Sequence, residues 1–468
     1  MQTLPSPLAE PPALSLADNL RSRRRRLAQK IDFPVLLWSG TAKPRNFAAN
    51  IYPYRASSHF LYFAGLPLEN AAIRIEGERL TLFIDNPTAD DVLWHGPSPS
   101  RDDIAEQIGA AAAYPLSRLA DLAVGAATLG EKDETVKMLE RAALQSGIVL
   151  PRQHPRGDQE LEKAIVQLRM MQDEGAIAST RRAIAVSVEA HKAGMAATAR
   201  AETEAQIRAA MEAVIIAHNM SCAYGSIVTV AGEVLHNHHY HHPVSSGDLL
   251  LADVGAETLD GWASDITRTW PISGTFSATQ RDLYDIVLAA HDACIEKARP
   301  GVEYADIHQA ACEIIAAGLV DLGILKGDPV ALVAEDAHAL FFPHGVGHLM
   351  GLDVHDMEDL GDLAGYAEGR QRSNRFGLAF LRLNRPLAVG MAVTIEPGFY
   401  QVPAILNDLK NRDHYAAMVN WERLEQFADV RGIRIEDDVL ITDQGCEVLS
   451  RALPTAAAEI EHQVQQIL

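Results

Sequence analysis

The chain has 468 residues, of which 48% are hydrophobic and 22% are charged, a composition typical of water-soluble proteins. This length predicts two or three domains. The formal net charge of −21 argues against a partner nucleic acid, because a phosphate-binding surface needs a basic footprint. Since no apolar stretch is long enough for a signal-peptide core or a membrane span, we expect a cytoplasmic protein with no membrane partner. The four cysteines show no CxxC spacing, so neither a disulfide framework nor a thiolate metal site is indicated.

The first third of the chain predicts a mixed α/β domain behind a flexible tail. Residues 1–18, rich in proline, alanine and leucine, are the expected tail. The arginines at 23–26 lie between leucines seven residues apart, and we expect them on the solvated face of a first helix. Short apolar runs separated by turn signals follow and predict strands. These runs are VLLW at 35, FLYFAGL at 60, AAIRI at 71 and LTLFI at 80, with a hairpin over 71–84.

The rest of the chain combines long helices with strand-like runs. PRQHPRGDQE at 151–160 contains proline and charge and marks a boundary region. Apolar residues at helical spacing predict a long helix over 177–195. SATQ at 277–280 is a capping box that begins a second helix, and a third is expected over 307–322. Strands are expected in DLLLADVG at 248, MAVTIEPGFY at 391 and GIRIEDDVLIT at 432.

Carboxylates flanked by strand-forming residues are the main chemical signal. Burying a carboxylate is costly unless it is paired with a cation or coordinates a metal. Together with one histidine, they form an oxygen-rich set that suits two divalent ions such as Mn²⁺ or Co²⁺ better than a lone structural zinc. Two carboxylates could bridge such ions at ~3.5–4 Å, with a shared water ionised to hydroxide. The residues are Asp253, Asp265, His348, Glu396 and Glu436.

The order Asp, Asp, His, Glu, Glu within its local sequences resembles the pita-bread metallopeptidase family, in the branch that contains aminopeptidase P and prolidase. The motifs are DVGAETLDGWASDITRTWPISGTFSATQRDLY, FFPHGVGHLMGLDVHD, GMAVTIEPGFY and GIRIEDDVLIT, while RASSHFLYFAGL and VLWHGPSPS resemble the branch's N-terminal domain. The resemblance implies an α+β protein, with a creatinase-like mixed α/β domain at 19–165 and a pita-bread catalytic domain at 166–468. It implies that the five residues above hold two divalent ions, with Mn²⁺ preferred and Co²⁺ or Zn²⁺ as alternatives.

Two features depart from the family pattern. The interval from Asp253 to Asp265 is twelve residues, one longer than usual, and a bulge or looser hairpin near Leu259-Asp260-Gly261 would absorb it. The segment QVPAILNDLKNRDHYAAMVNWERLEQFADV, which follows Glu396, resembles prolidase more than the shorter bacterial aminopeptidase P. The preferred substrate length is therefore left open.

The stretch LHNHHYHHP at 235–243 contains five of the eighteen histidines. Histidine-rich tracts bind metals unselectively, so the tract alone is weak evidence for a built site. The family places a substrate-binding histidine in the local sequence VLHN, which implies that His236 hydrogen-bonds the substrate near the scissile bond. The other four are expected in a loop at the mouth of the site: His238, His239, His241 and His242.

Roles for three residues follow from the motifs around the expected ligands. Glu396 is expected to accept the proton of the bridging water while also holding a metal. His355 is expected to stabilise the oxyanion of the tetrahedral intermediate. The two glycines of HGVGH argue against a helical HxxxH face, so His344 and His348 need not share a metal. His344 is expected to be structural.

Three further residues are expected near the substrate or behind the ligands. Arg434 alternates with Glu436 along a strand and is expected to steady it. Arg382 resembles the arginine that prolidases use near the substrate carboxylate, with a surface salt bridge as the alternative. Trp94 resembles an aromatic residue that reaches the neighbouring subunit's active site in this branch, with an ordinary core tryptophan as the alternative.

The resemblance implies metal-dependent hydrolysis of the N-terminal Xaa-Pro bond of peptides by a metal-bridging hydroxide. The alternative is an Xaa-Pro dipeptidase, which uses the same site chemistry. Methionine aminopeptidases usually lack such an N-terminal domain, and creatinase-type hydrolases lack the metal ligands. An inactive peptide-binding scaffold is the non-enzymatic alternative, although buried carboxylates without metal would destabilise it. The expected partners are a peptide with proline at the second position and further copies of this chain, as a homodimer or homotetramer.

Overall fold

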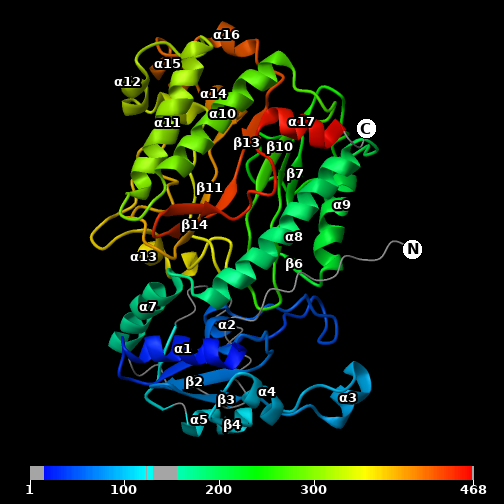
Figure 1. The fold of residues 1–468 in the computed structure, drawn as a ribbon, viewed down its shortest axis with the longest axis vertical. Helices are drawn as coiled ribbons and strands as arrows, with labels where there is room; N and C mark the ends of the chain where they lie inside the picture. The colour runs from blue at the N-terminus through cyan, green and yellow to red at the C-terminus, as the bar shows by residue number, and fades with distance from the viewer. Residues whose placement is uncertain (1–14, 123, 130–154, 466–468) are drawn as a thin grey trace. The chain divides into compact units, whose positions relative to one another are not determined.

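The computed structural model describes residues 15–122, 124–129 and 155–465. It divides into two compact units, each described here by itself (Figure 1). The first contains the described residues up to Arg169 and Asp173–Ala178, and the second contains Met170–Gln172 and the described residues from Ser179 onward. The expected boundary at 165 and 166 falls inside helix α7 (Pro155–Arg169). Of the boundary stretch 151–160, residues 151–154 lie outside the described residues, and the remainder begins α7.

The first unit is built on a five-stranded mixed sheet in the order β4-β3-β2-β1-β5. The central strands pair antiparallel, whereas β4 and β5 pair parallel to their neighbours at the two edges. The predicted strand at VLLW and the hairpin over 71–84 are confirmed as β1 and as the β2–β3 pair. The strands are β1 (Val35–Trp38), β2 (Ala72–Glu76), β3 (Arg79–Phe83), β4 (Ala112–Tyr114) and β5 (Ala127–Thr128).

Helices form much of the rest of the first unit. The strand predicted at FLYFAGL is wrong, because this run lies in helix α2, whose residues are all buried. A short segment that is apolar on every side has no periodicity to separate strand from helix. The expected tail ends earlier than residue 18, since α1 begins at Leu16; residues 1–14 lie outside the described residues. Besides α7, the helices are α1 (Leu16–Ala28), α2 (Ser58–Ala64), α3 (Ala89–His95), α4 (Arg101–Gln107), η1 (Leu116–Arg118) and α5 (Leu119–Leu122).

The first helix predicted around the arginine run is confirmed, but two of its arginines do not lie on a solvated face. Arg23 and Arg24 are buried, at 3% and 1% exposure. Arg23 pairs with Asp173 through two hydrogen bonds of 2.8 and 2.9 Å and donates to the Tyr62 carbonyl. Arg24 donates to backbone carbonyls, including that of Gly109 at 3.0 Å. Because these two guanidinium groups are buried and hydrogen-bonded inside the unit, the run does not form a basic docking surface.

The second unit contains short sheets whose strands meet at the expected carboxylates. Two three-stranded sheets have the orders β10-β8-β7 and β11-β14-β15, and β12-β13 and β6-β9 form two-stranded sheets. The three predicted strand regions are confirmed, but two of them divide, one at Glu396 and one at Glu436. The strands are β6 (Ser221–Cys222), β7 (Ile227–Thr229), β8 (Leu249–Asp253), β9 (Ala256–Glu257), β10 (Thr267–Pro271), β11 (Ala392–Ile395), β12 (Gly398–Tyr400), β13 (Gly432–Arg434), β14 (Asp437–Thr442) and β15 (Gly445–Val448).

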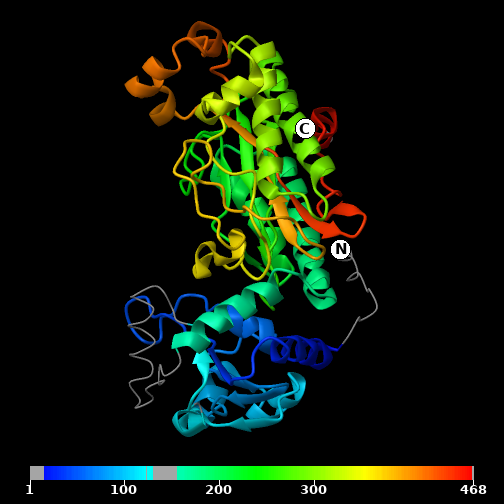
Figure 2. The ribbon, with the colours of Figure 1, turned by 90° about the vertical axis from the view of Figure 1, so that its left-hand side faces the viewer.

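Long helices flank these sheets, and all three predicted helices are confirmed. α10 begins with the predicted capping box, in which Ser277 accepts from the Gln280 amide at 3.1 Å and Gln280 accepts from the Ser277 amide at 2.9 Å. α10 and α11 pack side by side (Figures 1 and 2). The helices are α8 (Glu174–Thr198), α9 (Glu204–Ala217), α10 (Ala278–Lys297), α11 (Tyr304–Asp321), α12 (Pro329–Ala334), η3 (Ala337–Leu340), η4 (Glu358–Leu360), α13 (Asp362–Gly365), α14 (Pro403–Leu406), α15 (Leu409–His414), α16 (Trp421–Glu425) and α17 (Ala457–Gln465).

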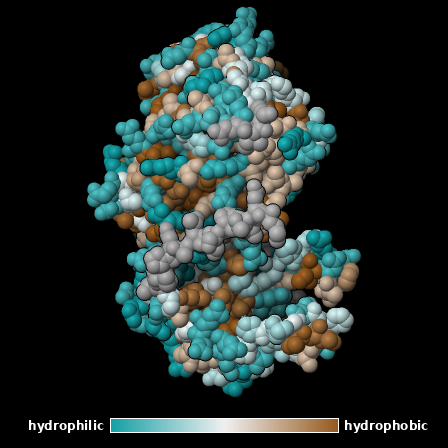
Figure 3. Space-filling view, turned by 45° about the vertical axis from the view of Figure 1, so that its right-hand side comes forward, coloured by the Kyte–Doolittle hydropathy of each residue, from teal (hydrophilic) through white to brown (hydrophobic). Residues whose placement is uncertain are grey.

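The long Asp253–Asp265 interval and the long segment after Glu396, the two departures from the family pattern, are both folded. The Asp253–Asp265 interval contains a hairpin with the loop 259–261, where the Thr258 amide donates to the Trp262 carbonyl at 3.0 Å. The long segment after β12 folds into α14, α15 and α16. Within the described ranges, no helix has the length and apolarity that crossing a membrane requires. On the face drawn in Figure 3, hydrophilic residues surround scattered hydrophobic patches.

Candidate active site

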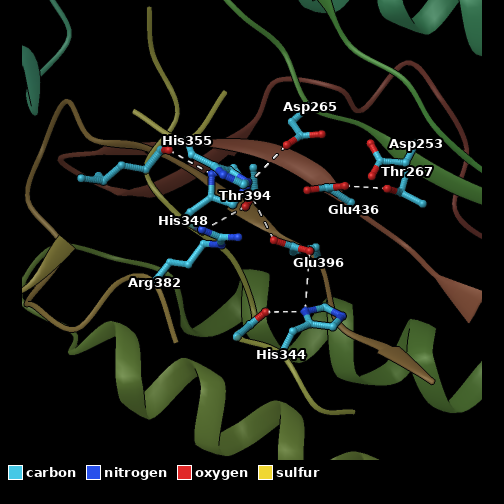
Figure 4. A network of polar contacts seen from close by, with 12 residues as sticks. Asp253, Asp265, Thr267, His344, His348, His355, Arg382, Thr394, Glu396 and Glu436 are labelled. Carbon is cyan, nitrogen blue, oxygen red and sulfur yellow. Dashed lines mark hydrogen bonds and ion pairs between the residues drawn. The ribbon is translucent and has the colours of Figure 1, made fainter. Parts of the chain in front are cut away.

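The five expected ligands converge in the second unit although they come from separate strands (Figure 4). Asp253 ends β8, and Asp265 lies two residues before β10, its antiparallel partner. Glu396 joins β11 to β12, and Glu436 joins β13 to β14. The strand ends therefore deliver all four carboxylates to one place. His348 reaches the same place from the irregular segment that follows η3.

The geometry around His348 suits a metal ligand. Its Nδ1–H donates to the Leu349 carbonyl at 3.0 Å, so in the neutral ring the lone pair that could bind a metal is on Nε2. Nε2 lies 3.4 Å from Asp265 Oδ2 and 3.7 Å from Glu396 Oε1. One ligand atom each of Asp265, His348 and Glu436 lies within 4.8 Å of the other two. These atoms are close enough to share one cation.

The charge of the cluster also fits divalent cations. Burial, followed by repulsion from Asp253, raises the pKa of Asp265 well above its ordinary value. Burial, followed by repulsion from Asp265, does the same to the pKa of Glu436. Burial raises the pKa of Glu396 to about 7. Each shift means that the ionised form is poorly compensated here, so a bound cation would restore the ordinary charge. An oxygen-rich set with one imidazole is the donor set that hard or borderline divalent ions prefer.

Arg434 supports the cluster differently from the expectation. Its Nη2 donates to Asp253 Oδ2 at 2.7 Å, and its Nη1 donates to the Tyr400 hydroxyl at 2.9 Å. Its Nε donates to Thr267 Oγ1 at 3.1 Å, and that hydroxyl donates to Glu436 Oε2 at 2.6 Å. The carboxylate that Arg434 contacts directly is therefore Asp253, and its link to Glu436 runs through Thr267.

Besides Thr267 and Tyr400, two residues that contact the aspartates were not anticipated from the sequence. The Tyr224 hydroxyl lies 2.5 Å from Asp253 Oδ1 and 2.6 Å from Asp265 Oδ1, so it shares one proton between them. Asp438 is fully buried, and its two oxygens accept from the Asp265 amide at 3.3 and 3.0 Å. Asp438 had a signal, because it is a further carboxylate in the apolar run GIRIEDDVLIT. Tyr224 lies in SCAYGS, which has no pattern that points to the site.

His344, which was expected to be structural, lies against Glu396 (Figure 4). Its Nδ1 is 3.8 Å from Glu396 Oε2 and donates to the Gly345 carbonyl at 2.8 Å. Its Nε2 lies 2.9 Å from the Tyr400 hydroxyl. Burial lowers the pKa of His344 to about 3, so the imidazole is neutral. As predicted, the HGVGH segment is not helical, and His344 and His348 face different oxygens of Glu396.

Two more histidines surround the carboxylates. The His355 ring lies 4.2 Å from the His348 ring, centroid to centroid, in a T-shaped contact. Burial lowers the pKa of His355 far below its ordinary value. Burial, followed by the charge of Arg434, lowers the pKa of the exposed His236. A protonated His236 would repel protons on His344 and His355 and lower their pKa values further, so the three imidazoles lie near one another.

The remaining tract histidines lie in irregular structure, as expected. His238, His239 and His241 are exposed. His242 differs, because its Nδ1 lies 2.9 Å from an oxygen of the fully buried Glu204. This contact anchors the end of the tract to the start of α9. Among the described residues, none of these four belongs to a group of side chains close enough together to hold a metal ion.

Arg382 lies at the edge of the site, in a salt bridge. Its Nη1 contacts both oxygens of Glu358, at 2.9 and 2.6 Å, and the two side chains are about one-third exposed. The same carboxylate lies 3.6 Å from His355 Nδ1. A pocket beside His348 is lined by Leu349, Glu358, Asp362, Arg372 and Arg382, among others.

Trp94 is 77% exposed, so the alternative of an ordinary core tryptophan is wrong. It lies on α3, none of whose residues is buried. Its neighbour Leu93 is 73% exposed. The helix therefore presents large apolar side chains to solvent in the single chain.

Comparisons with known proteins agree with this architecture. Residues 178–443 match the metallopeptidase family M24, and residues 20–135 match the aminopeptidase P N-terminal domain. A probable Xaa-Pro aminopeptidase of Leptosphaeria maculans is 32% identical over 421 residues, which cover 88% of this chain and 72% of that protein. The structure of Pseudomonas aeruginosa aminopeptidase PepP has a TM-score of 0.78 at 28% identity, covering 96% of this chain and 98% of that one. Zn-substituted E. coli aminopeptidase P in complex with product has a TM-score of 0.78 at 28% identity, covering 97% and 99%.

These matches confirm the resemblance drawn from the motifs and the α+β class with two domains of different kinds. The family match extends over more than half of the chain and includes all five convergent carboxylate and imidazole residues. The chain belongs to metallopeptidase family M24.

Proposed function

We propose that this chain is a metal-dependent Xaa-Pro aminopeptidase, which hydrolyses the N-terminal Xaa-Pro bond of peptides. The observation that carries the proposal is the convergence of four carboxylates and His348 Nε2 in a buried, undercompensated cluster. The names of the similar proteins support the same activity. In this proposal residues 19–165 form the N-terminal domain and residues 166–468 the catalytic domain.

The proposed ligands are Asp253, Asp265, His348, Glu396 and Glu436. A pair of divalent ions held by them supplies Lewis acidity and lowers the pKa of a water molecule. Mn²⁺ is the preferred ion because the donors are mostly carboxylate oxygens, and Co²⁺ and Zn²⁺ are the alternatives. Tyr224 and Arg434 hold the Asp253 carboxylate in place through hydrogen bonds of 2.5 and 2.7 Å.

Proton transfer is assigned to Glu396. Its carboxylate lies between two imidazoles, with one oxygen 3.7 Å from His348 Nε2 and the other 3.8 Å from His344 Nδ1, and a carboxylate in such a site can both accept and return a proton. Glu396 takes a proton from the attacking water at a carboxylate oxygen and gives it to the leaving proline nitrogen. His236 and His355 are neutral near neutral pH, since their pKa values are lowered, so each has an N–H to donate to the substrate carbonyl oxygen as negative charge develops there.

Peptides longer than two residues are the proposed substrates, with Xaa-Pro dipeptides as the alternative. The prolidase reading needs Arg382 to receive a substrate carboxylate. Its Nη1 already donates to both oxygens of Glu358, and this carboxylate offsets the charge that a substrate carboxylate would need, which disfavours that role. The test compares hydrolysis of Xaa-Pro, Xaa-Pro-Yaa and amidated Xaa-Pro peptides by the manganese-loaded protein. Tolerance of the extended peptides supports an aminopeptidase, and cleavage of the free dipeptide alone would overturn it.

The same proposal includes an assembly and a compartment. A homodimer or homotetramer would cover the exposed Leu93 and Trp94 of α3, which the single chain leaves in solvent. A cytoplasmic location is supported by the cysteines, all four of which are free thiols. Analytical ultracentrifugation of the wild-type protein and of Trp94→Ala tests the assembly. A monomeric wild-type protein at working concentration would contradict it.

A further inference from the structure

A second cluster of metal-binding side chains lies in the second unit, away from the proposed peptidase ligands. His308 and Cys312 lie one turn apart on α11, and His338 lies in η3. One ligand atom from each residue lies within 4.8 Å of the other two. The three residues are 0%, 1% and 2% exposed. None of them takes part in the proposed peptide hydrolysis.

His338 is the residue whose surroundings need an explanation. Both ring nitrogens are buried, and neither has a hydrogen-bond partner among the described residues. Buried polar groups in native proteins are nearly always satisfied, so an imidazole without a partner points to a missing ligand. Burial lowers the pKa of His338 to about 3 and that of His308 to about 4. Both rings are therefore neutral, and each has a nitrogen lone pair that a metal ion could use.

The distances suit a small tetrahedral ion. Cys312 Sγ lies 3.5 Å from His308 Nε2 and 4.0 Å from Nδ1. His308 Nε2 lies 3.0 Å from the Gly377 carbonyl oxygen and donates to it, which leaves Nδ1 as the free ligand atom. In a zinc site, metal–nitrogen bonds of ~2.0 Å and metal–sulfur bonds of ~2.3 Å separate the ligand atoms by roughly 3.3–3.6 Å. A small contraction of the cluster would complete this arrangement.

We propose that His308, Cys312 and His338 form a structural site for one Zn²⁺ ion, separate from the peptidase centre. On binding, the Cys312 Sγ–H bond breaks and its proton leaves to solvent, while the thiolate and two neutral imidazole nitrogens form bonds to the ion. The remaining tetrahedral position is filled by water or by a backbone carbonyl oxygen. Cysteine spacing did not reveal the site, because only one of the three ligands is a cysteine, and His338 comes from a different element than His308 and Cys312.

Such an ion would stabilise one side of the peptidase site. η3 leads directly into the segment that contains His344 and His348. The Phe342 ring lies 5.6 Å from the His308 ring and 4.9 Å from the His344 ring, between centroids. An ion joining α11 to η3 would hold this layer of rings in place. Its role is positional, since none of its ligands reaches the peptidase carboxylates.

Cobalt spectroscopy of the full-length protein tests the site. Co²⁺ replaces Zn²⁺, and a bond from a thiolate to Co²⁺ gives a near-ultraviolet charge-transfer band. The proposed peptidase ligands are carboxylates and an imidazole, so Co²⁺ bound there produces no such band. We expect the band in the wild-type protein, its loss in Cys312→Ser, and at least tenfold weaker Co²⁺ binding in His338→Gln. Added Zn²⁺ should displace the band.

Cys294→Ser is the matched control. Cys294 is also fully buried and lies on the neighbouring helix α10, but its Sγ faces the Ile307 carbonyl at 3.5 Å and it is outside the cluster. This variant should keep the band. Far-ultraviolet circular dichroism verifies that each variant is folded, and His338→Gln provides a second variant if Cys312→Ser is not. Absence of the band at saturating Co²⁺, or an unchanged band in Cys312→Ser, would overturn the proposal. Because the readout is absorbance, the result is independent of peptidase activity.

Discussion

Arg434 Nη2 donates to Asp253 Oδ2 at 2.7 Å, and both side chains are nearly buried. The pair joins β13 to β8, two strands that lie far apart in the sequence. It gives the carboxylate cluster one fixed internal cation. Burial, followed by repulsion from neighbouring carboxylates, raises the pKa values of Asp265 and Glu436 in the same cluster.

Arg434→Gln is predicted to destabilise the metal-free protein by about 3–5 kcal/mol, because the buried Asp253 loses its cation. The measurement is urea unfolding in the presence of a chelator. Arg181→Gln is the control, since Arg181 pairs with Glu447 through two hydrogen bonds of 2.8 and 2.7 Å at an exposed site. That change should cost about 1 kcal/mol or less. Similar losses in the two variants would show that the buried pair is not special.

Asp265→Asn and Glu436→Gln are predicted to abolish divalent-metal binding at the peptidase centre and with it turnover. A neutral amide lacks the negative charge with which these carboxylates would hold divalent ions. Metal analysis and peptide hydrolysis measure the two effects. Normal turnover with two ions per chain in either variant would remove that residue from the ligand set.

His236→Ala and His355→Ala are predicted to retain metal but to lose turnover by ~10²–10³, the usual effect of removing one preorganised oxyanion donor. His239→Ala and His241→Ala should change turnover little, because both side chains are exposed. Steady-state kinetics on an Xaa-Pro-Yaa peptide distinguishes the pairs. If His241→Ala were as damaging as His236→Ala, the substrate histidine would lie elsewhere in the tract.

The pKa of Glu396 predicts how the metal-free protein responds to pH. Its pKa is raised from 4.5 to about 7, so in this window the folded chain keeps a proton that the unfolded chain has released. Stability should therefore fall as the pH rises through the window. Glu396→Gln cannot ionise and should lose less stability over the same range. Urea midpoints measured across this range in chelator, for both proteins, provide the comparison. Parallel curves would contradict the assigned shift.

Arg382→Ala is predicted to leave the preference for extended over dipeptide substrates unchanged, because Glu358 already pairs with Arg382 through Nη1 and offsets its charge. The same variant should lower turnover modestly, because Glu358 loses its partner and its carboxylate stays next to His355. Glu358→Gln is the companion variant, since it frees Arg382 and should improve binding of Xaa-Pro dipeptides. A wild-type preference for free dipeptides that disappears in Arg382→Ala would establish the prolidase alternative.

Local sequence was sufficient for several elements of this protein. The capping box at Ser277, the long helix α8 and the hairpin of β2 and β3 depend on interactions between residues a few positions apart. The four carboxylates were identifiable one by one, because a charged residue among strand-forming residues is conspicuous without any knowledge of its partners. Their order along the chain then indicated the family.

Tertiary structure decided which groups meet. Tyr224 shares its proton between two aspartates, Arg434 contacts Asp253 in preference to Glu436, and His338 approaches α11. These partners are tens to nearly two hundred residues apart, so no local pattern records them. Helix α2 shows the complementary case, in which an entirely buried segment lacks the amphipathic period that reveals its secondary structure. Sequence periodicity shows which face of a segment is buried and which face meets water. A site is different, because its side chains come from distant segments and only tertiary packing brings them together.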